Sequence, residues 1–199
     1  MLTACASPET IPLDAGQDGT SSRSGATLLK SFAPGDRVDA PDFSGTTLTG
    51  DKVRLSDYRG EIVVVNAWAS FCGPCRAESP ALDRTQKKLR DQGVRVLGID
   101  TDNDSGSGLA FQKEYGLSYP SLHDPGGKQF LELPAGLVNP QVLPFTLFVD
   151  REGRIARSIQ APVSEKALTQ ILTPLLKEAA KPAPTATPTA TPTPAAKRK

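Results

Sequence analysis

The chain has 199 residues, of which 38% are hydrophobic and 18 are proline, and its formal net charge is +1. Residues 181–199 hold four basic side chains and no acidic one, so residues 1–180 carry a charge of −3, which does not fit a general nucleic-acid binder. No apolar run approaches the roughly 18 residues that indicate a transmembrane helix. The composition is that of one globular domain with a proline-rich extension.

Residues 1–35 lack hydrophobic periodicity and are rich in Ser, Gly, Thr and Asp, so they are predicted to form a flexible leader. Within this leader, Leu2-Thr3-Ala4-Cys5 resembles a bacterial lipobox, which makes Cys5 a candidate lipidation site. A lipoprotein signal also needs a basic and an apolar segment ahead of the box, and here only Met1 precedes it. The alternative is a chance match around a free cysteine.

Residues 36–180 alternate strand and helix signals and are predicted to form a single domain. The expected elements are a small hairpin of 42–46 with 52–55, a strand at 62–65, a helix at 74–91, a strand at 94–99, a helix at 109–115, strands at 146–149 and 154–159, and a helix at 165–180. The short turn between the last two strands predicts an antiparallel pair. Pro174 is expected to kink or break the last helix. This order predicts an α/β fold with a mixed sheet and helices on both faces.

Residues 181–199 contain only Pro, Ala, Thr and basic residues, so they bury too little apolar surface to fold. They are predicted to form a disordered, extended basic tail.

A Cys-x-x-Cys motif, Cys72-Gly73-Pro74-Cys75, directly follows a predicted buried strand and opens a predicted helix. Unpaired N–H groups and the positive dipole end at a helix N-terminus stabilise a thiolate, which is the form of cysteine that attacks disulfides. Cys75 lies one turn further on, near enough to close a disulfide with Cys72. Pro74 fits the first turn, where its missing N–H costs nothing. The motif therefore predicts a redox-active pair.

Two other interpretations of the motif are a structural disulfide and half of a zinc site. A zinc site needs a second Cys/His pair, and the chain offers only Cys5 and His123 for it. We therefore predict no metal site. The sequence shows no flavin or nicotinamide motif either, so no cofactor is predicted.

The segments around the motif resemble the thioredoxin superfamily, in particular its membrane-anchored extracytoplasmic branch of ResA/TlpA-like thiol-disulfide oxidoreductases. The resemblance spans residues 36–180 and is carried by Pro41-Asp42-Phe43, by residues 55–60, by Asn66-Ala67-Trp68-Ala69-Ser70, by Glu78 and Pro80, and by residues 143–150. It implies a thioredoxin-like fold, with a central mixed sheet flanked by helices on both faces and an added N-terminal β-hairpin.

The resemblance also implies catalytic roles. Cys72 attacks the substrate and Cys75 resolves the mixed disulfide, so that the two form a redox-active disulfide. Glu78, buried behind Cys75 with a raised pKa, accepts its proton; the alternative is a solvent-facing helix glutamate. Pro144 in the cis form turns the backbone of Leu143 toward the first cysteine to pair with an incoming peptide; the alternative is an ordinary trans proline.

The expected substrate groove is lined by Trp68, Phe71, Gly73, Pro74, Leu143 and Phe145. Trp68 is expected to pack beside the disulfide; the alternative is a core residue, and it can serve both purposes. Phe71 and Phe145 depart from the residues common in the family and alter the rim of this groove. Asn66 stands where cytoplasmic thioredoxins carry a buried aspartate, which leaves Glu78 as the main candidate base. The Gly73-Pro74 dipeptide has no His or Lys to stabilise the thiolate further, which favours a reductant or isomerase over a strong oxidant.

Two rival functions use related folds. A peroxiredoxin shares the Pro41-Asp42-Phe43 opening but needs a threonine three residues before its reactive cysteine, where Ala69 stands. A Sco-like copper chaperone needs two cysteines and a distal histidine, and His123 is the only candidate. The turn sequence at 124–127 instead predicts that His123 is a surface-loop residue.

The sequence thus predicts a thiol-disulfide oxidoreductase that is monomeric and extracytoplasmic, either lipid-anchored in a bacterial cell membrane or secreted. Its expected partners are protein disulfide or dithiol substrates, with an apocytochrome c as one possibility by analogy, and a membrane-embedded thiol reductant as the electron source. We expect no nucleic-acid partner.

Overall fold

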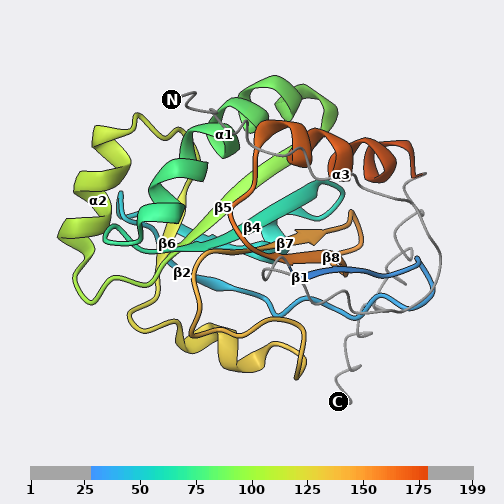
Figure 1. Cartoon of the computed structure of the whole chain (residues 1–199), viewed down its shortest axis with the longest axis horizontal. Coiled ribbons are helices and arrows are strands. Elements are labelled where there is room, and N and C mark those ends of the chain that lie inside the picture. Colours follow the sequence, from blue (N-terminus) through green and yellow to red (C-terminus); the bar gives the residue numbers. More distant parts are fainter. Residues whose placement is uncertain (1–27, 179–199) are drawn as a thin grey trace, which may run out of the picture.

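The computed structural model describes residues 28–178, so Cys5 and the tail at 181–199 lie outside the described residues. A six-stranded sheet in the order β1-β8-β7-β4-β5-β6 forms the centre of the domain (Figure 1). Its strands are β1 (Leu28–Ser31), β4 (Ile62–Trp68), β5 (Val94–Asp100), β6 (Ser121–His123), β7 (Phe145–Val149) and β8 (Ile155–Gln160). Strands β4, β5 and β6 run parallel and the other pairs are antiparallel, which confirms the predicted mixed sheet.

Strand β4 lies inside the sheet, between β5 and β7, and all seven of its residues are buried. A run of β-branched residues suits this position because both faces of the strand are covered. The strand continues three residues beyond the predicted segment 62–65 and ends at Trp68. It therefore delivers the chain to the edge of the sheet just before the cysteine motif.

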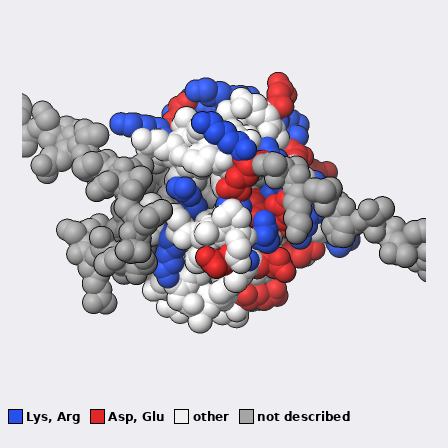
Figure 2. Space-filling view, turned by 90° about the vertical axis from the view of Figure 1, so that its right-hand side faces the viewer, with Lys and Arg blue, Asp and Glu red and all other residues white. Residues whose placement is uncertain are grey.

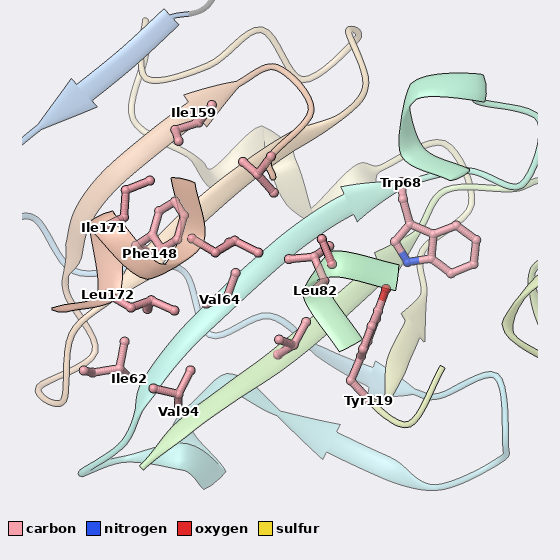
Figure 3. Close-up of a cluster of buried hydrophobic side chains, with 14 of the residues drawn as sticks. Ile62, Val64, Trp68, Leu82, Val94, Tyr119, Phe148, Ile159, Ile171 and Leu172 are labelled. Carbon is pink, nitrogen blue, oxygen red and sulfur yellow. The ribbon is translucent and has the colours of Figure 1, made fainter. Parts of the chain in front are cut away.

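Three α-helices bury their apolar sides against one face of the sheet. They are α1 (Gly73–Leu89), α2 (Ser105–Glu114) and α3 (Glu165–Lys177). The first two connect neighbouring parallel strands, and the right-handed sense of such connections puts them on the same face. Figure 3 shows part of the resulting core, to which Leu82 of α1, Phe148 of β7 and Ile171 and Leu172 of α3 contribute.

The opposite face is covered by shorter elements. These are the antiparallel hairpin of β2 (Ser44–Thr46) and β3 (Lys52–Arg54), and the 3-10 helices η1 (Leu55–Tyr58) and η3 (Lys128–Glu132). Their side chains form a second apolar cluster that includes Phe43, Leu55 and Phe130. The predicted hairpin is confirmed. Helices do lie on both faces, but only 3-10 helices cover this one. A third such turn, η2 (Arg90–Gln92), follows α1.

Two features differ from the sequence expectation. Strand β1 lies within the segment assigned to a flexible leader, because it pairs along its length with β8 and so finds main-chain partners that no local pattern reveals. Helix α3 runs through Pro174 to Lys177 instead of breaking there. Pro174 lies on the exposed side, while Leu168, Ile171 and Leu172 hold the helix against the core.

Helix α2 begins at Ser105, four residues before the predicted start. The preceding Asp104 is its N-cap, and the carboxylate accepts a hydrogen bond from the N–H of Ser107 at 2.9 Å. Such a cap favours a helix start even in a glycine-rich sequence.

A buried ion-pair cluster ties the two ends of the domain together. The Arg37 guanidinium donates to Asp150 at 3.0 Å and, through both terminal nitrogens, to Glu178 at 2.7 Å.

The face seen in Figure 2 carries acidic and basic side chains together, with the acidic ones gathered on one half, and shows no continuous basic surface. Among residues 28–178, no helix has the length and apolar character that a membrane crossing requires.

Candidate active site

Cys72 and Cys75 form a disulfide at the start of α1. Cys72 is the N-cap of the helix, and its Sγ atom accepts a hydrogen bond from the backbone N–H of Cys75 at 3.3 Å. Pro74 lies in the first turn, as predicted. The two sulfurs differ in access, because Cys75 is fully buried whereas Cys72 is only partly buried. An incoming disulfide can therefore reach only Cys72 without a rearrangement.

The surface beside the disulfide is apolar. Phe71 is 79% exposed, Gly73 and Pro74 are exposed, and Leu143 is half-buried. Leu143 packs against the same apolar cluster as Cys72. These four residues were expected to line a substrate groove, which stays a prediction.

The Leu143–Pro144 peptide bond is cis, as the resemblance implied. Strand β7 follows directly, and its first residue, Phe145, pairs with Ala67 near the end of β4. Pro144 therefore lies at the same edge of the sheet as the end of β4, which leads to the cysteines.

Two residues expected in the groove belong to the core instead. Trp68 is fully buried and packs against Phe111, with ring centroids 4.9 Å apart and the ring planes tilted by 47°. Phe145 is also fully buried and meets Phe130 edge-on at 4.8 Å. In this state neither side chain can touch a substrate, because the period-two alternation of a strand turns each one into an apolar cluster.

Glu78 lies one helical turn after Cys75 on the buried side of α1, and its side chain is almost completely buried. One carboxylate oxygen accepts a hydrogen bond from the side-chain amide of Asn66 at 2.8 Å, and the other accepts one from the backbone N–H of Val163 at 2.8 Å. Burial raises the pKa of Glu78 to about 7, against the opposing effect of these two hydrogen bonds. A carboxyl group with this pKa can both accept and release a proton at neutral pH.

Asn66 joins Glu78 to the strand that follows Pro144. Its amide nitrogen lies 2.8 Å from Glu78, 3.1 Å from the hydroxyl of Thr146 and 3.5 Å from the carbonyl oxygen of Phe145. This neutral donor holds the Glu78 carboxyl group without adding a second titratable group beside it.

Two further residues near the site, Asp102 and Arg76, carry no functional signal in the sequence. The loop between β4 and α1 is held by Asp102, which accepts the N–H of Ser70 at 3.0 Å, and by Arg76, which donates to the Ser70 carbonyl oxygen at 3.3 Å. Asp102 lies between the predicted strand at 94–99 and the predicted helix at 109–115, and Arg76 lies in the predicted helix at 74–91; the sequence assigned a role to neither. Only their contacts reveal a role.

The prediction that His123 lies in a surface loop was wrong. This residue ends β6, and its Nδ1 atom lies 3.0 Å from Oδ2 of the fully buried Asp100 on β5. The strand register aligns Trp68, Asp100 and His123 across three neighbouring strands. Within residues 28–178, no group of three or more His, Cys, Asp or Glu side chains is placed to hold a metal ion.

Comparison with known proteins finds a matching family model, similar curated proteins and similar solved structures. The model of the AhpC/TSA family matches residues 37–158. The chain belongs to this family, within the thioredoxin superfamily. The thiol-disulfide oxidoreductase ResA of Geobacillus kaustophilus is 33% identical over 133 residues, which cover 67% of this chain and 74% of that protein. ResA of Bacillus subtilis is 29% identical over 130 residues, covering 65% and 70%.

Similar solved structures agree. A secreted thiol-disulfide isomerase from Corynebacterium glutamicum has 31% identity and a TM-score of 0.72, and the match covers 82% of this chain and all of that one. A DsbF homologue from Corynebacterium diphtheriae has 34% identity and a TM-score of 0.70, covering 80% and 100%. The chain is thus an enzyme of thioredoxin type, a thiol-disulfide oxidoreductase.

Proposed function

We propose that the protein works outside the cytoplasm as a reductant of disulfides in protein substrates, with Cys72, Cys75, Glu78 and Pro144 as its catalytic residues. The observation that carries this proposal is a redox pair of unequal access, Cys72 partly open and Cys75 buried, with the buried Glu78 one turn behind it. The secreted relative from Corynebacterium supports the location.

The reaction begins with the reduced enzyme. The Cys72 thiolate attacks one sulfur of the substrate disulfide, so that a mixed disulfide forms and the first substrate thiolate leaves and takes up a proton. Glu78 then accepts the proton of Cys75, directly or through water, and the Cys75 thiolate attacks the sulfur of Cys72. The second substrate thiolate leaves and is protonated. Two electrons have passed to the substrate, and the enzyme holds the Cys72–Cys75 disulfide.

The apolar surface formed by Phe71, Pro74 and Leu143 suits the docking of an unfolded or extended polypeptide. We propose that the substrate backbone pairs with Leu143 beside Pro144, as the family resemblance implies. An apocytochrome c is one substrate of this kind. We further propose that a membrane-embedded thiol reductant regenerates the dithiol, and that the protein acts as a monomer tethered to the membrane by lipid on Cys5.

Insulin reduction tests the activity. The reduced protein should cleave the disulfides of insulin, Cys72→Ser should be inactive, and Cys75→Ser should accumulate a mixed disulfide that non-reducing electrophoresis detects. Activity that survives in Cys72→Ser would refute the assignment of the nucleophile.

The reduction potential of the Cys72–Cys75 pair tests the direction. A value near that of thioredoxin, about −270 mV, supports a reductant, whereas a value near about −120 mV would make the protein an oxidant. Lys-C or tryptic mass mapping of the protein from a bacterial membrane fraction tests the lipid on Cys5.

A further inference from the structure

The peptide unit around Ser70 is held from both sides. Its N–H donates to Oδ2 of Asp102 at 3.0 Å, and its carbonyl oxygen accepts from Nη1 of Arg76 at 3.3 Å. Ser70 stands two residues before Cys72, and the N–H of Cys72 donates to the carbonyl oxygen of Ala69 at 3.1 Å, which closes the turn. A shift of Ser70 would therefore move Cys72 relative to the first turn of α1.

Asp102 is itself fixed in place. Its side chain is nearly buried, and its backbone N–H donates to Oδ1 of Asp100 at 3.1 Å. The other oxygen of Asp100 is held by Nδ1 of His123 at 3.0 Å. The neighbouring Thr101 adds two hydrogen bonds to the carbonyl oxygen of Trp68, from its N–H at 2.9 Å and from its hydroxyl at 3.1 Å. The two residues that follow β5, Thr101 and Asp102, thus form hydrogen bonds to the chain at Trp68 and at Ser70.

Arg76 is fixed by contacts with helix α2. Its guanidinium carbon lies 5.2 Å from the ring centroid of Phe111 and 5.0 Å from that of Tyr115, and it forms an ion pair with Glu114 at 3.1 Å. Stacking on aromatic rings and a planar fork of donors restrict an arginine more than a lysine. The donor that reaches Ser70 is therefore presented in one orientation.

We propose that Asp102 and Arg76 are positioning residues that set the reactivity of Cys72 by clamping the Ser70 peptide. The clamp keeps the Cys72 sulfur at the helix N-terminus, where the N–H of Cys75 faces it. Backbone donors and the helix dipole stabilise a thiolate only over a short distance, so a loosened loop leaves the thiol less acidic. The proposal rests on thiol-disulfide exchange at Cys72.

The thiol pKa of Cys72 tests the clamp in the full chain carrying Cys5→Ser and Cys75→Ser, where Cys72 is the only thiol. Asp102→Ala removes the acceptor for Ser70, and Asp102→Asn keeps an acceptor oxygen but loses the charge. Asp104→Asn is the matched control, because it removes a charge two residues away while asparagine still caps α2. Thiolate absorbance and the rate of iodoacetamide alkylation are measured across pH.

The clamp predicts that Asp102→Ala raises the thiol pKa by about one pH unit and lowers alkylation at neutral pH roughly tenfold. Asp102→Asn should resemble Asp104→Asn, with a pKa equal to or slightly below that of the parent. If the charge of Asp102 alone mattered, the alanine variant would lower the pKa as the asparagine variant does, and this result would overturn the proposal.

Arg76→Lys is an independent test, because it keeps the positive charge but removes the planar guanidinium group that packs on Phe111 and Tyr115. It should also raise the thiol pKa, and an unchanged pKa would overturn the proposal. If Asp102→Ala does not unfold cooperatively in thermal denaturation, the thiol pKa of Arg76→Lys tests the proposal instead. Failure of the protein with its three native cysteines to reduce insulin would refute the proposed function instead, since the pKa comparison does not depend on a protein substrate.

Discussion

The side-chain amide of Asn66 donates a hydrogen bond of 2.8 Å to the carboxyl group of Glu78, and both residues are almost completely buried. The two residues come from consecutive elements, the central strand β4 and helix α1. A neutral partner stabilises the carboxylate only partly, so burial dominates and the pKa of Glu78 rises to about 7. This value suits the proposed role of Glu78 in accepting the Cys75 proton near neutral pH.

Glu78→Gln should slow the resolution of the mixed disulfide by at least roughly tenfold, because glutamine cannot accept the Cys75 proton. In the wild type the rate of resolution should rise as pH increases through about 7, where Glu78 ionises, and this rise should be absent from the variant. Rapid-quench measurement of a single turnover with a disulfide peptide separates resolution from attack. Glu165→Gln, at a half-exposed position on α3, is the control and should keep the wild-type profile.

The same pKa predicts how stability depends on pH. Burial raises the pKa of Glu78 from 4.5 to about 7, so the folded state holds this proton more tightly than the unfolded state. The contribution of Glu78 to the free energy of unfolding is greatest below pH 4.5. This contribution, about 3 kcal/mol, is lost as pH rises through about 7. Glu78→Gln removes this loss.

Urea unfolding of the oxidised wild type and of Glu78→Gln, at several pH values, checks the sign. The difference in stability between the two proteins should move in favour of the variant as pH increases. Asp100, whose pKa is also raised by burial to about 7, should leave a remaining slope in both proteins. A difference that stays constant across pH would contradict the assignment of a buried, neutral Glu78.

Arg37→Met should lower the free energy of unfolding by about 2 to 3 kcal/mol. Arg37 and Asp150 each expose only 4% of their side chains. The substitution leaves the buried Asp150 carboxylate with Arg154, 2.9 Å away, as its charged partner, and it removes both hydrogen bonds to Glu178. Arg84→Met is the matched control, because the pair of Arg84 with Glu165 is 60% and 40% exposed and should contribute at most about 1 kcal/mol. Equal losses in the two variants, measured by urea unfolding, would refute the special role of the buried cluster.

Reduction of the protein should increase its tryptophan fluorescence. Trp68 is the only tryptophan of the chain, is fully buried, and shares its apolar cluster with Cys72 and Cys75. A nearby disulfide quenches an indole by accepting its excited electron, and two thiols quench it less. The emission of Cys75→Ser should not respond to a dithiol reductant. An unresponsive wild type would show that Trp68 is shielded from the disulfide.

Local signals in the sequence determined much of this protein. The β-branched run at 62–65 predicted a buried strand, and the Cys-x-x-Cys motif at the following strand-to-helix junction predicted the reactive pair and its chemistry. Period and propensity are encoded within a few residues, so they need no knowledge of distant partners. The placement of Pro144 and Glu78 followed from the resemblance carried by neighbouring motifs.

Only the tertiary structure decided which distant groups meet. Glu78 bonds to the N–H of Val163, 85 residues further along the chain, and Ser70 bonds to Asp102, 32 residues away. Trp68 was expected to pack beside the disulfide or in the core, and only the structure shows it fully buried in the apolar cluster that also contains Cys75. The pKa of a carboxyl group, the orientation of a reactive loop and the exposure of an aromatic ring depend on what packs around them, and that packing is set by the whole sheet and its helices together.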